Sequence, residues 1–159
     1  MFKQRFKEKK LKDKSGLEGY GLWLLSQREM SRKSVMDKML GYAENKDDVD
    51  LVLDRLEELG YLNDERYAEM YVRSCKTSKG YGPIKTKIKM KEKGIPSNII
   101  DAHLNESDEC WGDLAMQARE RKFGDLPHDR DEKNRQMRFL ASRGFSFSQI
   151  SKAFLTPEG

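Results

Sequence analysis

The fold is decided by one stretch of the sequence, VLDRLEELGYLNDERYA at residues 52–68. Apolar residues recur through its first half at the spacing of a helix, and they are Val49 just before it, then Val52, Leu53, Leu56 and Leu59. Gly60 follows as the residue that closes a helix, and Asn63 or Asp64 stands where a side chain can cap the next one. The stretch therefore predicts a helix, a glycine turn and a second helix.

The same turn recurs along the chain, at residues 93–95 and 143–145, and Gly41-Tyr42 is a fourth copy. Tyr20, Tyr67 and Leu114 are separated by a period of about 47 residues, which indicates one supersecondary unit used several times. The sequence predicts an all-α protein, an elongated array of three tandem three-helix repeats with helix-turn-helix-like units. We expect a basic N-terminal tail at residues 1–14 and repeats at residues 15–62, 63–106 and 107–159.

The middle helix of the second repeat is ambiguous. Residues 84–91 alternate with period two, a pattern typical of a strand. Helix is favoured because Pro83 suits the first helical position, Gly94 suits the position after the last, and no partner strand is visible. Read as a helix, the segment has an apolar stripe and a basic face, formed respectively by Ile84, Ile88 and Ile95 and by Lys85, Lys89 and Lys93.

Two further expectations concern packing. Gly41 is expected to end the helix that Ser31 caps, in the position of a C′ glycine. Four aromatic residues fall at core spacings, so we interpret them as packing residues rather than as platforms for stacking bases; they are Trp23, Tyr67, Tyr71 and Phe139.

Charge is unevenly distributed along the chain. The formal net charge is +4, with 31 Lys and Arg against 27 Asp and Glu. Residues 1–14 and 79–95 each carry a net charge of +5, while residues 44–69 carry −7. Basic segments suit a polyanion, whereas naked DNA would repel the acidic segment. The pattern therefore favours a partner that has basic surface of its own.

Composition excludes several classes of protein. Apolar residues make up 36% of the chain and the mean hydropathy is −0.88. No run approaches the roughly 18 apolar residues of a membrane helix, and the charged N-terminus lacks the apolar region of a secretory signal. We therefore expect a cytoplasmic protein without membrane contact, in which Cys75 and Cys110 are reduced.

No motif for catalysis, a cofactor or a metal is present. The segment 80–83, Gly-Tyr-Gly-Pro, has a proline where a phosphate-binding loop needs a backbone donor. His103 and His128 are too far from each other and from the cysteines to read as a zinc motif. We therefore expect a binding protein with no catalytic residue, no cofactor and no metal ion.

What remains is a set of basic helix faces. Lys85, Lys89 and Lys93 lie one turn apart on one face, and other Lys and Arg residues flank the first-repeat turn or end helices of the third repeat. In an array that turns gradually, equivalent positions of successive repeats line one concave surface. Such a surface suits a filament or a nucleic-acid strand.

At these residues the sequence resembles the RecX family of bacterial regulatory proteins, from about Tyr20 to Phe154. The resemblance rests on residues 24–29 with 31–32, 52–68, 79–83 with 93–95, and 138–140 with 143–145. It implies tandem three-helix repeats, in agreement with the repeat count. At two positions the sequence departs from the family: the Gly41 turn lacks a basic residue before its glycine, and Lys89-Met90 replaces the usual acidic–apolar pair.

The resemblance also implies a function. Family members bind the RecA recombinase filament in its helical groove and suppress its ATPase, strand exchange and coprotease activities in DNA repair and the SOS response. The implied partners are the RecA filament and single- or double-stranded DNA, the latter bound weakly and non-specifically, and we expect a monomer. The residues expected to contact RecA or DNA are Arg28, Arg32, Lys33, Arg73, Lys79, Lys85, Lys89, Lys93, Arg119, Arg121, Lys122, Arg138 and Arg143.

The residues alone leave two other functions open. One is a DNA-binding protein of helix-turn-helix type that acts without RecA. The acidic segment and the lack of a base-reading cluster of Arg, Asn and Gln count against sequence-specific recognition by such a protein. The other is a helical adaptor for a different protein, which predicts binding to neither DNA nor RecA.

Overall fold

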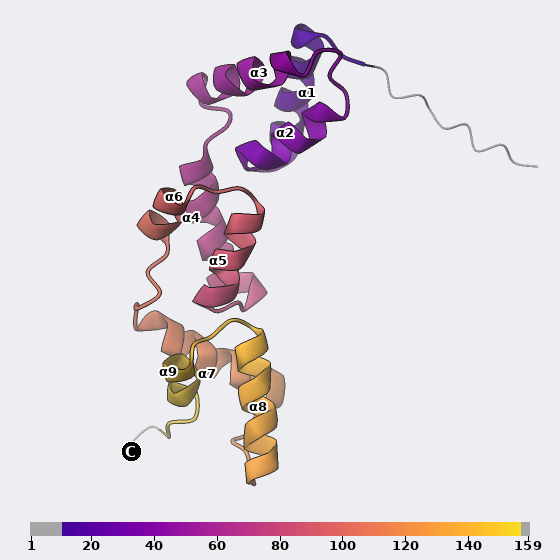
Figure 1. Ribbon diagram of the computed structural model, residues 1–159. Helices are drawn as coiled ribbons and strands as arrows, with labels where there is room; N and C mark the ends of the chain where they lie inside the picture. The colour runs from indigo at the N-terminus through magenta and orange to yellow at the C-terminus, as the bar shows by residue number, and fades with distance from the viewer. Residues whose placement is uncertain (1–10, 157–159) are drawn as a thin grey trace, which may run out of the picture. The chain divides into compact units, whose positions relative to one another are not determined.

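The computed structural model describes residues 11–156 (Figure 1). Within this range there are nine α-helices, one π-helical turn and one isolated bridge, between Lys12 and Ala43. The elements are α1 (Lys14–Gln27), α2 (Arg32–Leu40), α3 (Asp47–Glu58), α4 (Asp64–Ser74), η1 (Cys75–Lys79), α5 (Pro83–Glu92), α6 (Ser97–His103), α7 (Cys110–Phe123), α8 (Arg130–Ser142) and α9 (Phe147–Lys152). The prediction of an all-α protein is confirmed. The chain divides into two compact units, one up to Tyr67 and one from Ala68 on.

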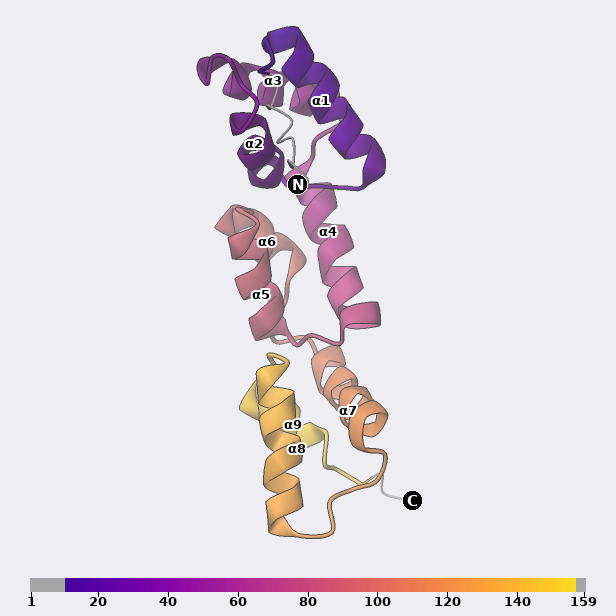
Figure 2. The ribbon, with the colours of Figure 1, turned by 90° about the vertical axis from the view of Figure 1, so that its right-hand side faces the viewer.

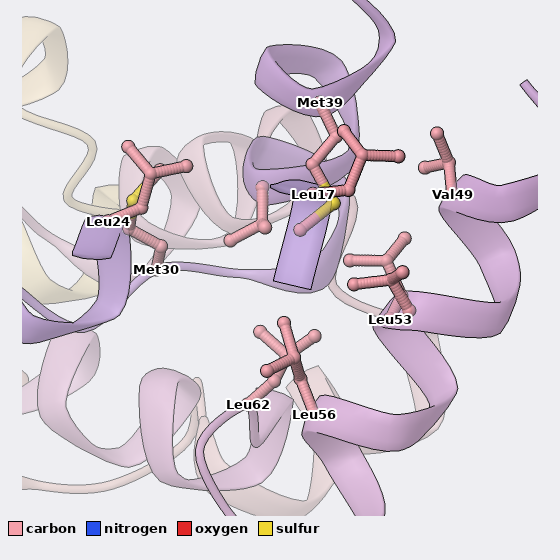
Figure 3. Packing of buried hydrophobic residues seen from close by; sticks show 10 residues of the cluster. Leu17, Leu24, Met30, Met39, Val49, Leu53, Leu56 and Leu62 are labelled. Atoms are coloured by element: carbon pink, nitrogen blue, oxygen red, sulfur yellow. The ribbon is translucent and has the colours of Figure 1, made fainter. Parts of the chain in front are cut away.

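The first unit packs α1, α2 and α3 around one apolar cluster (Figure 3). Its buried members are Leu17, Leu24, Met30, Val35, Met39, Val49, Val52, Leu53, Leu56 and Leu62. Side chains fix where two of the helices begin. Asp13 accepts the N–H of Gly16 at 2.8 Å, and Ser31 accepts the N–H of Ser34 at 3.2 Å. From α3, the predicted stripe is buried except for Leu59, which is exposed.

The orientation of α1 is set by a glycine. Its buried residues are Leu17, Gly21 and Leu24. A Cβ at Gly21 would lie 2.6 Å from Met39 Cε and 2.8 Å from Leu56 Cδ1, so α1 approaches the core closely at this point. Trp23 therefore points away from the core, is 58% exposed and stacks on Tyr20 with 6.3 Å between ring centroids. The prediction of Trp23 as a core residue is wrong.

Helix α1 begins inside the range predicted as a basic tail. Lys12 pairs its backbone with the turn after α2: its N–H donates to Tyr42 O at 2.6 Å, and its carbonyl accepts from Glu44 N at 3.0 Å. Residues 1–10, the remainder of the predicted tail, lie outside the described residues.

Three of the four predicted glycine turns share one backbone conformation. Gly60, Gly94 and Gly144 have φ angles of 80°, 74° and 92°, in the left-handed region that glycine adopts without strain. In each case the residue after the glycine donates its N–H to a carbonyl in the preceding helix. Gly41 has φ −71° and lies in the right-handed helical region. The prediction of Gly41 as a fourth copy and as a C′ glycine is therefore wrong.

Residues 83–92 form the helix α5, as predicted, with Pro83 at its start. Its buried face is different from the predicted one. Pro83, Thr86 and Met90 are buried, while Ile84 is 45% and Ile88 51% exposed. Of the predicted stripe only Ile95 is buried. The Thr86 hydroxyl donates a hydrogen bond to the Gly82 carbonyl at 2.8 Å, so this buried hydroxyl has a partner. The alternating sequence pattern does not predict that Thr86 is buried.

In the second unit α7 packs against α8 and α9, and α5 packs beside α6 (Figure 2). The buried apolar residues of α7, α8 and α9 include Trp111, Ala115, Leu140 and Ile150. Tyr67 and Tyr71, on the two sides of the unit boundary within α4, are buried as predicted, and Phe139 is half-buried.

Candidate partner-binding surface

The start of α5 is bonded directly to the turn between α8 and α9. The Gly82 N–H donates to the Arg143 carbonyl at 2.7 Å, and the Ile84 N–H donates to the Gly144 carbonyl at 3.0 Å. Pro83, between them, has no N–H to donate. Two otherwise unpaired donors at the start of a helix are therefore satisfied by another part of the second unit.

Glycine is required on both sides of this contact. A Cβ at Gly82 would lie 2.5 Å from the carbonyl carbon and oxygen of Gly144, and a Cβ at Gly144 would overlap the backbone of Lys85. These clashes are with backbone atoms, which cannot rotate away. The contact therefore explains Gly82 and Gly144 in the segments that carry the family resemblance, and it fixes the basic helix α5 beside the end of α8.

Aromatic rings hold the cations around this contact. Lys85 Nζ lies 4.4 Å from the centroid of the Tyr81 ring. Arg143 and Lys122 lie 5.2 and 5.7 Å from the centroid of the Phe139 ring. Phe139 in turn packs edge-on against Phe123, with 5.4 Å between centroids. A cation over an aromatic face is attracted by the ring, which restricts its position while the charge stays available to a partner.

Two further arginines belong to the same region. Arg135 lies 5.5 Å from the centroid of the Phe123 ring. Arg121 lines a hollow of about 20 Å³ together with Tyr81 and Phe145. A space of this size holds about one water molecule and no metabolite. The α5–α8 surface, as we call it, consists of Lys85, Arg121, Lys122, Arg135 and Arg143 with Tyr81, Phe123 and Phe139.

The structure thus brings together four of the thirteen predicted contact residues, Lys85, Arg121, Lys122 and Arg143. Arg135 was left out of the predicted contact set, as were the aromatic rings of the surface. The sequence signal for Arg135 was its helical spacing from Arg138 and from Phe139. Phe139 is predicted as a packing residue, and that prediction does not include the contacts of its ring with Arg143 and Lys122.

The other predicted contact residues of the second unit lie outside the α5–α8 surface. Arg73 pairs with Glu69 at 3.2 Å and Lys89 with Glu92 at 3.5 Å. Lys79 lies 5.8 Å from the centroid of the Tyr71 ring. Arg138 is exposed on α8, and Lys93 forms the C-terminal cap of α5. Exposed pairs such as these open readily, so the residues remain accessible to a partner.

Arg119 is not a surface residue, and its prediction as a contact residue is wrong. Only 4% of it is exposed. Its Nε donates to the Ala153 carbonyl at 2.9 Å and its Nη1 to the Asp125 carbonyl at 3.2 Å. The guanidinium thereby satisfies carbonyl groups after α7 and α9, so Arg119 stabilises the second unit.

In the first unit Arg32 lies among carboxylates of α3. Its guanidinium is 2.9 Å from both Asp54 and Glu57 and 3.8 Å from Asp50. The backbone N–H of Arg32 also donates to the Asp64 carboxylate at 2.9 Å. Arg32 therefore links α2, α3 and the start of α4, and part of its charge is already neutralised. The other two predicted residues of this unit are Arg28, which is exposed, and Lys33, which lies 3.8 Å from Asp37.

Neither cysteine has the environment of a nucleophile. Burial raises the pKa of the Cys75 thiol, and burial together with Asp108 raises the pKa of the Cys110 thiol. Both groups are therefore protonated at neutral pH. Among residues 11–156 no three His, Cys, Asp or Glu side chains are grouped so that they could hold a metal ion. None of the helices in that range combines the length and apolar character needed to cross a bilayer.

Comparison with known proteins identifies the family. Models of the second and third three-helix domains of RecX match residues 63–104 and 112–154. The regulatory protein RecX of Halorhodospira halophila is 35% identical over 133 residues, covering 83% of this chain and 82% of the relative. That of Legionella pneumophila is 36% identical over 136 residues, covering 84% and 89%.

Solved structures agree with these matches. The crystal structure of RecX from Lactobacillus salivarius superimposes with a TM-score of 0.76 at 26% identity, covering 88% of this chain and 93% of that one. The relatives from Halorhodospira halophila and Legionella pneumophila are regulatory proteins by name, and the nine α-helices of residues 11–156 fit the tandem three-helix domains of the family. The chain belongs to the RecX family of regulatory proteins.

Proposed function

We propose that this protein is a non-enzymatic negative regulator of RecA, which binds the RecA–DNA filament and lowers its ATPase, strand exchange and coprotease activities. The observation that carries the proposal is the α5–α8 surface, a group of five cations, four of them over aromatic rings, in a chain of the RecX family. Because RecA filaments form on cellular DNA, the proposal places the protein in the cytoplasm.

The chemistry of the surface suits this partner. Arg and Lys side chains bind both phosphates and carboxylates, so one surface can contact filament DNA and acidic parts of RecA. Weak contacts to several neighbouring protomers add up when they are made by one chain. Contacts that span neighbouring protomers would oppose the motion between them that couples ATP turnover to strand exchange.

The acidic first unit supports a protein partner in addition to DNA. Residues 11–67 hold nine Lys and Arg against thirteen Asp and Glu, a formal net charge of −4. Residues 68–156 hold seventeen against twelve, a net charge of +5. A polyanion alone would be repelled by the first unit, whereas a RecA filament offers protein surface as well as phosphates.

The experiment is a titration of the DNA-dependent ATPase of RecA with this protein. A parallel assay at the same salt concentration measures DNA binding without RecA. We expect inhibition at fewer than one molecule per RecA protomer, with weak binding in the parallel assay. Unaltered ATPase and strand exchange at micromolar excess would contradict the proposal.

A second candidate function rests on the +5 charge of residues 68–156, namely DNA binding without RecA. It predicts tight binding to naked DNA that weakens steeply as the salt concentration rises. Strong, salt-sensitive DNA binding with no effect on RecA would favour this function over the first.

A further inference from the structure

Helix α5 has a second exposed face that the α5–α8 surface does not use. Ile84, Lys87, Ile88 and Lys91 follow the spacing of one helix face, and the two isoleucines are about half exposed. Lys91 makes no ion pair within residues 11–156, and Lys87 pairs with Glu106 at 3.5 Å. This α5 face is therefore an exposed apolar pair with Lys87 and Lys91 along one side and Lys85 along the other, away from the buried Thr86 and Met90.

Helix α3 has an exposed face of the opposite charge. Asp47, Leu51, Asp54 and Glu58 lie on the side opposite its buried valines and leucines, and Leu51 is 53% exposed. Arg32 neutralises Asp54 on one edge, whereas Asp47 and Glu58 form no ion pair among the described residues. This α3 face is therefore an apolar residue with carboxylates on one side and Arg55, which pairs with Glu18, on the other.

The two faces complement each other in charge, and both expose apolar side chains. Each combines exposed apolar side chains with charges that are mainly acidic on α3 and basic on α5, over a similar number of helical turns. Exposed large apolar side chains surrounded by charge are typical of interaction sites. We propose that the α3 face of one copy of this protein binds the α5 face of a second copy.

Such a contact joins copies head to tail. Because the two faces differ, a single contact of this kind is heterologous. Each contact involves only two short helices, so it falls below the roughly 800 Å² per partner of a stable interface and is weak in solution. It becomes effective where copies are already held side by side on a polymeric partner.

Zero-length cross-linking tests the proposal. A carbodiimide joins a Lys Nζ to a carboxylate only where the two touch. An equal mixture of ¹⁴N- and ¹⁵N-labelled full-length protein, at a concentration on the order of 0.1–1 mM suited to a weak interface, separates links between copies from links within one. We expect mixed-label links from Lys87 or Lys91 to Asp47, Asp54 or Glu58, with a yield about tenfold lower when salt screens the charges.

Charge exchange makes the test specific. The variants Lys87→Glu/Lys91→Glu and Asp47→Lys/Glu58→Lys should each lose self-association, because like charges then meet. A mixture of the two variants should regain it, since both pairs of faces are complementary again. Circular dichroism confirms that each variant is folded.

A matched control separates the faces from overall charge. The variant Lys14→Glu/Lys38→Glu changes the net charge by the same amount at exposed positions elsewhere. It should keep self-association, because both of its faces are unchanged. Links found only within one copy, or an equal loss of self-association in the control variant, would each overturn the proposal.

Discussion

The main groups of basic residues in the two units have different partners. In the first unit Arg32 is surrounded by three carboxylates, and Arg55 and Arg66 pair with Glu18 and Glu29. In the second, the cations of the α5–α8 surface lie over Tyr81, Phe123 or Phe139 or line the hollow beside Tyr81. An ion pair consumes charge that a partner would need, whereas an aromatic ring positions a cation without neutralising it. The α5–α8 surface therefore keeps positive charge that Arg32, Arg55 and Arg66 do not.

The largest expected effect distinguishes two glycine turns of the same conformation. Gly60→Ala in the first unit has open space around its Cβ and should lose about 1–2 kcal/mol, the cost of a left-handed alanine. Gly144→Ala adds a clash with the backbone of Lys85 and should lose about 3 kcal/mol or more. Urea denaturation of both variants measures the difference. Equal losses would show that the contact between α5 and the turn after α8 contributes nothing to stability.

Reversing charge on the α5–α8 surface should weaken inhibition of RecA. For Arg121→Glu/Lys122→Glu we expect an inhibitory concentration about tenfold higher, a loss of about 1.4 kcal/mol, because two outward cations are replaced by anions. Lys14→Glu/Lys38→Glu carries the same change of net charge in the first unit and should differ from wild type by less than about twofold. If both variants lose inhibition equally, only overall charge matters.

Arg32 should matter for stability more than for binding. Removal of its side chain in Arg32→Ala leaves Asp50, Asp54 and Glu57 without their shared cation and should cost about 1 kcal/mol, less at high salt because the pairs are partly exposed. Arg55→Ala loses only its pair with Glu18 and should cost a few tenths of a kcal/mol. Thermal melting at low and high salt measures both. A cost for Arg32→Ala that does not change with salt would mean that packing, not charge, accounts for it.

The smallest expected effect concerns two glycines of α1. A Cβ at Gly19 meets nothing within 4 Å, so Gly19→Ala should stabilise the protein by about 0.5–1 kcal/mol through helix propensity. Gly21→Ala has the same propensity gain but places its Cβ against Met39 and Leu56, so it should destabilise. Melting temperatures that shift in the same direction for both variants would contradict the packing described for α1.

Much of the fold follows from the sequence because it depends on local rules. Ser31 caps a helix as predicted, Asp129 and Ser146 cap helices by the same local rule, and Gly60, Gly94 and Gly144 adopt the left-handed turn. The helical state of residues 84–91 follows from Pro83 and Gly94 even though their apolar pattern suggests a strand. These features involve residues close together in the chain, so spacing and residue type are sufficient to predict them.

The predictions that failed depend on contacts between distant segments. Helical spacing predicts Trp23 in the core. The structure instead places Gly21 against Met39 and Leu56, a close approach that spacing alone does not reveal. Ile84 and Ile88 were expected to be buried, but the contact of Gly82 with Gly144 turns Thr86 and Met90 inward instead. Arg119 was expected at the surface, yet it binds a carbonyl 34 residues away. For the same reason the grouping of Lys85 with Arg143 could not be read from the sequence.

The most direct test of the account is amide hydrogen exchange of the full-length protein, free and bound to a RecA filament on single-stranded DNA. The account predicts slower exchange on binding in residues 81–93 and 118–145, which carry the α5–α8 surface. Unchanged exchange in both segments, under conditions where the protein inhibits RecA, would contradict it and place the contact elsewhere in the chain.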